Sequence, residues 1–181
     1  TVLKQLSDCS KLRKLKLKDC DGERGIRSSV LRALFSKTKI SDLNIRNCEL
    51  ERFPKLVDLK NVTSLVIMDN NGYRYPLEYA EQLFTAIKNN ADTLLCLRLS
   101  VQNITPAERD KLFSLTESCK QLKIFHFQYP HPDEITEANL TRVLKLNNLV
   151  SLSVVVSPQM SLKTREAFVD RLRAGKFRKL E

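Results

Sequence analysis

A spacing of apolar residues that recurs six times constrains the fold of this 181-residue chain more than any other feature. Counted from the first residue of each copy, apolar side chains stand at offsets 0, 3 and 5, and successive copies begin 28, 22, 32, 28 and 27 residues apart. Self-similarity at a period of about 20–50 residues predicts a repeat architecture, in which each copy stacks on its neighbours. The eighteen positions are Leu12, Leu15 and Leu17; Ile40, Leu43 and Ile45; Val62, Leu65 and Ile67; Leu94, Leu97 and Leu99; Leu122, Phe125 and Phe127; Leu149, Leu152 and Val154.

Each copy predicts one short strand followed by a return segment. Offsets 3 and 5 alternate with offsets 2, 4 and 6, and alternation with period two is typical of a strand with one buried face. Stacked copies would form a parallel sheet whose buried face needs a cover. Apolar residues at helical spacing predict that the return segments supply the cover. The helices expected on this ground span residues 28–36, 78–89, 137–146 and 161–173, and another begins at Pro106.

Two return segments carry more specific predictions. The second return, residues 50–60, is short and contains Pro54, so we expect a turn or a single helical coil there rather than a full helix. In the last predicted helix we expect Phe168, Val169 and Leu172 to face the core.

The residue at offset 8 extends the pattern to a known signature. The first three copies carry Cys20, Cys48 and Asn70 there, and the next three carry Gln102, Pro130 and Ser157. The whole pattern resembles the leucine-rich repeat, L-x-x-L-x-L-x-x-N/C, and the periods near 28 are most similar to intracellular repeats of the ribonuclease-inhibitor, F-box-protein and immune-receptor types. The resemblance implies a right-handed α/β solenoid, or horseshoe, of about six repeats. Its parallel sheet would line the concave face and its helices the convex face.

The resemblance covers nearly all of residues 1–181, which we therefore interpret as a single leucine-rich-repeat domain. In the family, the offset-8 Asn or Cys side chain bonds loop backbone between coils, which Pro130 cannot do. We expect the chain to be a fragment of a longer protein, because Leu180 begins a seventh strand that stops at Glu181.

Net charge and cysteine content limit which partners and which cellular compartment are expected for this chain. The net charge is +10, and residues 1–60 carry 15 Lys/Arg against 8 Asp/Glu, so the positive field favours acidic partners near the N-terminal end. Five cysteines with no zinc-ligand spacing favour a reducing, intracellular location, cytoplasmic or nuclear. The sequons at Asn61, Asn103 and Asn139 leave secretion as a weaker alternative. No apolar run is long enough to predict a membrane span.

No motif in the chain predicts catalysis, a cofactor or a metal. With four glycines, a phosphate loop or a dinucleotide fingerprint has little to be built from. His126 and His131 lie near Asp133 and Glu134, but their spacing matches no metal-ligand pattern, so we interpret both histidines as surface residues. Cys20 and Cys48 could be reactive thiols, although a buried structural cysteine fits offset 8 better. We therefore expect a binding protein rather than an enzyme.

The strand positions that face solvent carry the functional prediction. They are basic in the first copy and include apolar Val66, Met68, Ile124 and Val155 further along, and an apolar set rimmed by charge is typical of protein-binding patches. The hypothesis is a protein-recognition module, the substrate- or ligand-binding arm of a larger protein, whose partner offers an acidic or phosphorylated segment. The alternative is a nucleic-acid-binding repeat domain that uses the basic N-terminal end. The predicted contact residues are Lys16, Lys18, Arg46, Val66, Met68, Arg98, His126 and Gln128.

Overall fold

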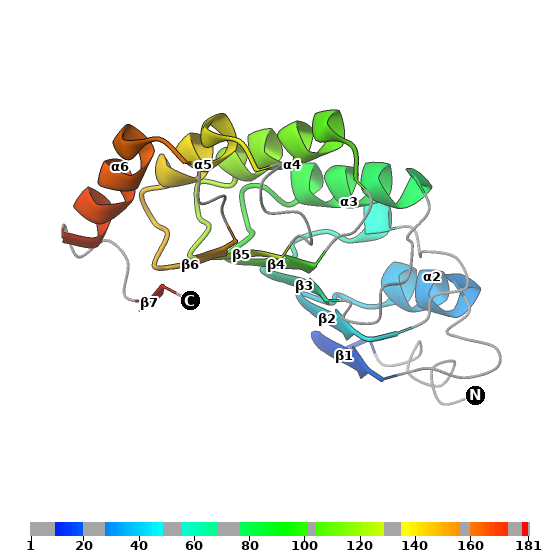
Figure 1. The fold of residues 1–181 in the computed structure, drawn as a ribbon. Helices are drawn as coiled ribbons and strands as arrows, with labels where there is room; N and C mark the ends of the chain where they lie inside the picture. Colours follow the sequence, from blue (N-terminus) through cyan, green and yellow to red (C-terminus); the bar gives the residue numbers. More distant parts are fainter. Residues whose placement is uncertain are drawn as a thin grey trace.

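The computed structural model describes residues 10–19, 28–48, 56–68, 77–100, 104–128, 135–155, 160–173 and 179–180. Within these ranges it is an α/β protein built around one parallel sheet, whose strands follow one another in chain order from β1 to β7 (Figure 1). The strands are β1 (Lys14–Lys18), β2 (Asp42–Arg46), β3 (Ser64–Met68), β4 (Cys96–Ser100), β5 (Ile124–Gln128), β6 (Ser151–Val154) and β7 (Lys179–Leu180).

Helical segments alternate with the strands and lie along one face of the sheet (Figure 1). The fold class predicted from the sequence is therefore confirmed at the level of a parallel sheet with alternating helices, an arrangement that is compatible with a solenoid. The helical segments are α2 (Ser28–Lys37), the 3-10 helix η1 (Leu56–Asp58), α3 (Leu77–Asn89), α4 (Pro106–Ser118), α5 (Glu137–Leu144) and α6 (Leu162–Arg173).

The sheet keeps equivalent positions of the sequence pattern in register. Leu43 on β2 pairs with Leu15 on β1 and with Leu65 on β3, and the same alignment continues through Leu97 and Phe125. Of the eighteen patterned positions, only Leu12 and Val154 are partly rather than fully buried. The spacing at offsets 0, 3 and 5 thus predicted the core of the described strands.

Aromatic side chains fill the core under α4. The Phe113 ring meets Phe125 and Phe127 edge-on, with ring centroids 5.8 and 5.2 Å apart. Phe125 and Phe127 stack on each other with their planes only 9° apart. Edge-to-face and stacked rings add a geometric preference to the burial of their area, so this part of the core has little freedom to rearrange.

The same pair of hydrogen bonds recurs at the entrance of every strand from β2 to β6. The carbonyl of Arg13 accepts the N–H groups of Ser41 and Asp42 at 2.8 and 3.0 Å, and the carbonyl of Ser41 accepts the next pair at the same two distances. The carbonyls of Thr63, Leu95 and Lys123 continue this series. We call it the entry ladder; it fixes where each strand begins relative to the one before.

Capping explains where two of the helices begin. Thr105 and Glu108 form a capping box in front of α4, with Pro106 in the first turn, as the sequence predicted. Thr136 and Asn139 form the equivalent box at α5. Asn139 is fully buried and also donates to Asp110 at 2.6 Å, so this sequon is inaccessible in the folded chain.

In the described part of the second return, residues 56–60, the structure has the one-turn helix η1, in agreement with the single helical coil predicted from the short length of this segment. The side chain of Asn90, just after α3, packs over this short return segment and bonds to its backbone. Its side-chain amide donates to the carbonyls of Leu59 and Ala86 at 3.0 and 2.8 Å, and its oxygen accepts the N–H of Val62 at 2.8 Å. Asn90 is 3% exposed, so these bonds satisfy buried backbone groups that would otherwise be costly to desolvate.

The last helix differs from its prediction. Val169, expected in the core, is 40% exposed, and Leu162 at the start of α6 is 71% exposed. Among the described elements α6 packs chiefly on α5, at the end of the row of helices, so its outer side has no neighbour to cover it (Figure 1). The side chains of Phe168 and Leu172 lie outside the described part of the structure. No helix within the described ranges is long and apolar enough to cross a membrane.

Candidate functional site

The helices lie along one face of the sheet (Figure 1), and the predicted contact residues stand at the strand positions that alternate with the buried offsets 3 and 5. We call this surface the open face and define it by the strand side chains at offsets 2, 4 and 6. Because the strands are parallel and in register, these side chains form three rows across the sheet. The offset-4 row runs through Lys16, Asn44, Val66, Arg98 and His126.

The register brings all eight predicted contact residues into two neighbouring rows. Lys18, Arg46 and Met68 are aligned at offset 6, directly beside the offset-4 row. Gln128 lies in the offset-6 row as well, paired with Ser100 on β4. Strands about 4.8 Å apart place Lys16 and His126, four strands apart, roughly 19 Å from each other. An extended peptide or a short helix could span that distance.

The β1 end of the open face is its most accessible and most basic part. Lys14, Lys16 and Lys18 are all exposed. The Lys18 ammonium forms an ion pair with Asp19 at 3.1 Å, and Asp19 also accepts a hydrogen bond from the Asn47 side-chain amide at 3.0 Å. The hydrogen bond from Asn47, followed by that from Lys18, lowers the pKa of the Asp19 carboxyl. Asp19 therefore stays ionised and offsets part of the charge of Lys18, whereas Lys16 has no carboxylate against it among the described residues.

The centre of the open face holds two arginines in defined positions. Arg46 donates from Nε to the side-chain oxygen of Asn44 at 3.0 Å, which orients the guanidinium along the sheet. Arg98 stands in the offset-4 row between Val66 on β3 and His126 on β5. Both arginines are half-buried, so a partner would meet guanidinium groups whose stems are already ordered.

Val66 is the one predicted contact residue that is buried in the structure. It was expected to face solvent, but only 4% of its surface is exposed. Its register neighbours, Asn44 and Arg98, carry longer side chains and leave the short valine little contact with solvent. The expectation of an exposed Val66 is therefore wrong.

The apolar set expected on this surface also fails to form one patch. Met68 on β3 and Ile124 on β5 are half-buried, and they lie two strands and two rows apart. Val155, which follows β6, is 48% exposed but stands at the far end of the sheet. Ser100 and Ser151, also on the open face, are 7% and 8% exposed. The open face is thus polar and charged rather than an apolar patch with a charged rim.

The β5 end carries the polar residues His126 and Gln128. The Nε2 atom of His126 lies 2.9 Å from the Ser151 hydroxyl on the next strand, which fixes the ring against the sheet. Gln128 is exposed. Sequence reasoning missed three residues that position contact residues: Asn44, Asp19 and Ser151. Their only signal is their place beside Arg46, Lys18 and His126 in the rows, which a linear pattern does not display.

The charge balance of the open face decides what it can bind. Its eighteen positions include five cations, Lys14, Lys16, Lys18, Arg46 and Arg98, and a single carboxylate, Asp42. Within the described ranges no group of histidine, cysteine and acidic side chains is arranged to hold a metal ion. The arrangement can pair with anions and donate hydrogen bonds.

The remaining sequence candidates divide between buried and undescribed positions. Cys48 is 2% exposed, and its thiol donates to the Arg46 carbonyl at 3.1 Å, which fits a structural cysteine. Cys48, Cys96 and Cys119 are free thiols. The other offset-8 residues and the residues considered as metal ligands beside His126 lie outside the described part of the chain: Cys20, Asn70, Gln102, Pro130, Ser157, His131, Asp133 and Glu134.

Comparison with protein-family models, with curated proteins and with solved structures found no match to this chain.

Proposed function

We propose that the chain is a leucine-rich-repeat solenoid whose open, concave face recognises another protein through an acidic or phosphorylated segment. The observation that carries the proposal is the alignment of five cations against one carboxylate on the accessible face of the sheet. The sequence signature, the in-register sheet and the entry ladder support the solenoid. Free Cys48, Cys96 and Cys119 support an intracellular location.

The geometry gives the contact residues different tasks. Lys16, exposed at the β1 end, attracts an acidic segment from a distance. Arg46 is oriented by its hydrogen bond to Asn44, and Arg98 is half-buried; both present guanidinium groups, which match the geometry of carboxylates and phosphates. His126 and Gln128 add hydrogen bonds at the other end. Met68, half-buried beside Arg46 in the offset-6 row, supplies an apolar contact.

The test measures binding of a phosphoserine peptide library with acidic flanking residues to the full chain. The variant is Lys16→Glu with Arg98→Glu. The matched control is Lys88→Glu with Lys123→Glu, which makes the same change in charge at exposed positions outside the open face. We expect the open-face variant to weaken binding of the selected peptides by about tenfold or more and the control by less than about twofold, because exposed charges farther than a Debye length apart are screened at 0.15 M salt. Equal weakening by both variants would contradict the proposal.

A nucleic-acid-binding function is the second candidate, and the net charge of +10 with the exposed Lys14, Lys16 and Lys18 favours it. The two candidates differ in stacking and in salt dependence. No Phe or Tyr stands on the open face, so bases would have no aromatic ring to stack on there. Phosphate neutralisation along a nucleic acid makes log K fall steeply and linearly with log salt concentration. Tight, steeply salt-dependent binding of random single-stranded RNA or duplex DNA would favour this second function over protein recognition.

A further inference from the structure

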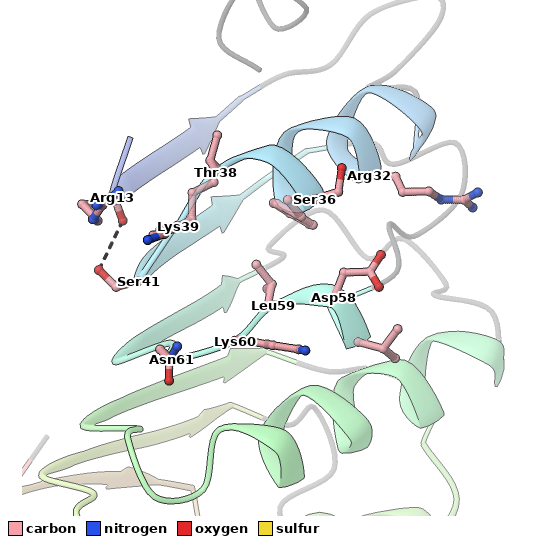
Figure 2. Close-up of a pocket in the computed structure, with 13 residues that line it drawn as sticks. Arg13, Arg32, Ser36, Thr38, Lys39, Ser41, Asp58, Leu59, Lys60 and Asn61 are labelled. Atoms are coloured by element: carbon pink, nitrogen blue, oxygen red, sulfur yellow. Dashed lines mark hydrogen bonds between the residues drawn. The ribbon is translucent and has the colours of Figure 1, made fainter. Parts of the chain in front are cut away.

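The short second return leaves a pocket that the open face does not share. It lies between α2 and the segment formed by η1 and the residues that follow it, and its volume is about 870 Å³ (Figure 2). Figure 2 shows Arg32 and Ser36 on the α2 wall and Asp58 and Lys60 on the opposite wall. None of the open-face side chains lines this pocket.

The lining combines an apolar floor with a cationic rim. Phe35, Ile40 and Leu59 belong to the hydrophobic core and are 2–3% exposed. Four cations stand around them, and Asp58 is the one acidic residue among the described residues of the lining. The cations are Arg13, Arg32, Lys39 and Lys60. An apolar floor that displaces water strengthens the attraction between these cations and an anion.

The cations are not neutralised within the described part of the chain. Arg32, Lys39 and Lys60 form no ion pair there, and neither does Asp58. The described residues of the lining therefore carry an excess of three positive charges.

We propose that this pocket binds a small organic anion that carries two phosphate groups. A volume of about 870 Å³ lies within the range of small-molecule pockets. A phosphate monoester carries about −1.5 to −2 charge at pH 7, so two such groups balance the excess charge of the lining. Cations on both walls would hold the two groups, and the apolar floor would take the carbon skeleton between them. The exposed amide of Asn61 offers a further donor at the rim.

The proposal is independent of recognition by the open face. A ligand held by Arg32 on α2 and by Lys60 beyond η1 would tie together α2 and the segment that follows η1. Because such a ligand binds only the folded chain, it would also raise the stability of this end of the sheet.

The test titrates the full chain with inorganic tripolyphosphate at 0.15 M salt by calorimetry, with inorganic phosphate and a doubly phosphorylated peptide as comparison probes. The pocket variant is Lys39→Gln with Lys60→Gln. The matched control, Lys14→Gln with Lys16→Gln, removes the same charge from the open face. All four lysines are exposed, so both variants should keep the urea midpoint of the unliganded chain.

We expect saturable tripolyphosphate binding that raises the urea midpoint, weakens about tenfold or more in the pocket variant and changes less than about twofold in the control. Equal weakening in both variants, no saturable binding, or phosphate binding as tightly as tripolyphosphate would overturn the proposal. Tighter binding of the doubly phosphorylated peptide than of tripolyphosphate, weakened by the pocket variant and not by the open-face control, would overturn the assignment to a small molecule. Failure of the open-face peptide assay would leave these results unaffected, because its variants do not alter the pocket.

Discussion

Replacing Leu97 by alanine should remove a large fraction of the stability of the chain. Leu97 is fully buried on β4, where its register neighbours are Leu65 and Phe125. Leu→Ala substitutions in cores cost about 2–5 kcal/mol, and the cost rises with the cavity that remains. Phe125 is held by the stacked Phe127 and the edge-on Phe113, so the site has little freedom to collapse. We therefore expect a loss of about 4 kcal/mol, near the upper end of that range.

The assay is urea unfolding followed by circular dichroism, with Lys16→Ala as the control at an exposed position of the same sheet. For a chain of this size, about 4 kcal/mol corresponds to a melting temperature lower by roughly 8–16 °C. The control should stay within about 0.5 kcal/mol of the wild type. Leu65→Ala, at the equivalent position of β3, should resemble Leu97→Ala. Small and equal midpoint shifts in all three variants would refute the register on which the reasoning rests.

Three further predictions address other parts of the structure. Asn90→Ala should cost about 1–3 kcal/mol in urea unfolding, because it leaves the buried Leu59 carbonyl and Val62 N–H without partners, and an unchanged midpoint would contradict this. Burial raises the pKa of the Cys119 thiol to about 11, so iodoacetamide at pH 8 should alkylate Cys119 far more slowly than a free thiol, as followed by mass spectrometry; comparable rates would contradict its burial. Limited proteolysis within residues 70–76 should release no stable half, since β3 and β4 pair in one sheet; a compact fragment would indicate two domains.

Local periodicity was enough to predict the strands, their buried positions and most of the helices. Alternation with period two depends only on neighbouring residues, so Leu43 and Ile45 could be placed in the core without knowing what covers them. The one-turn helix in the described part of the second return followed equally from Pro54 and the short length of that segment. These features rest on information within a few residues of each position.

The features that escaped prediction depend on distant neighbours. Val66 is buried because of side chains on two other strands, and Val169 is exposed because α6 lies at the end of the row of helices. In the sequence Asn90 looks like any polar residue after a helix. Its role depends on hydrogen bonds to Val62 and Leu59, which lie 28 and 31 residues earlier in the chain. The pocket between α2 and η1 joins residues from three separate segments, and no linear pattern marks it.

The entry ladder has a consequence for insertions and deletions. Its paired bonds have the same lengths whether the intervening stretch is 22 or 32 residues long. Adding residues to a return segment, or removing them, therefore does not change which side chains of the following strand face the core. A single residue inserted between the entry carbonyl and the end of a strand would instead move every later side chain of that strand to the opposite face. Length variation should accordingly accumulate in the return segments, and the five-residue strands should keep their length.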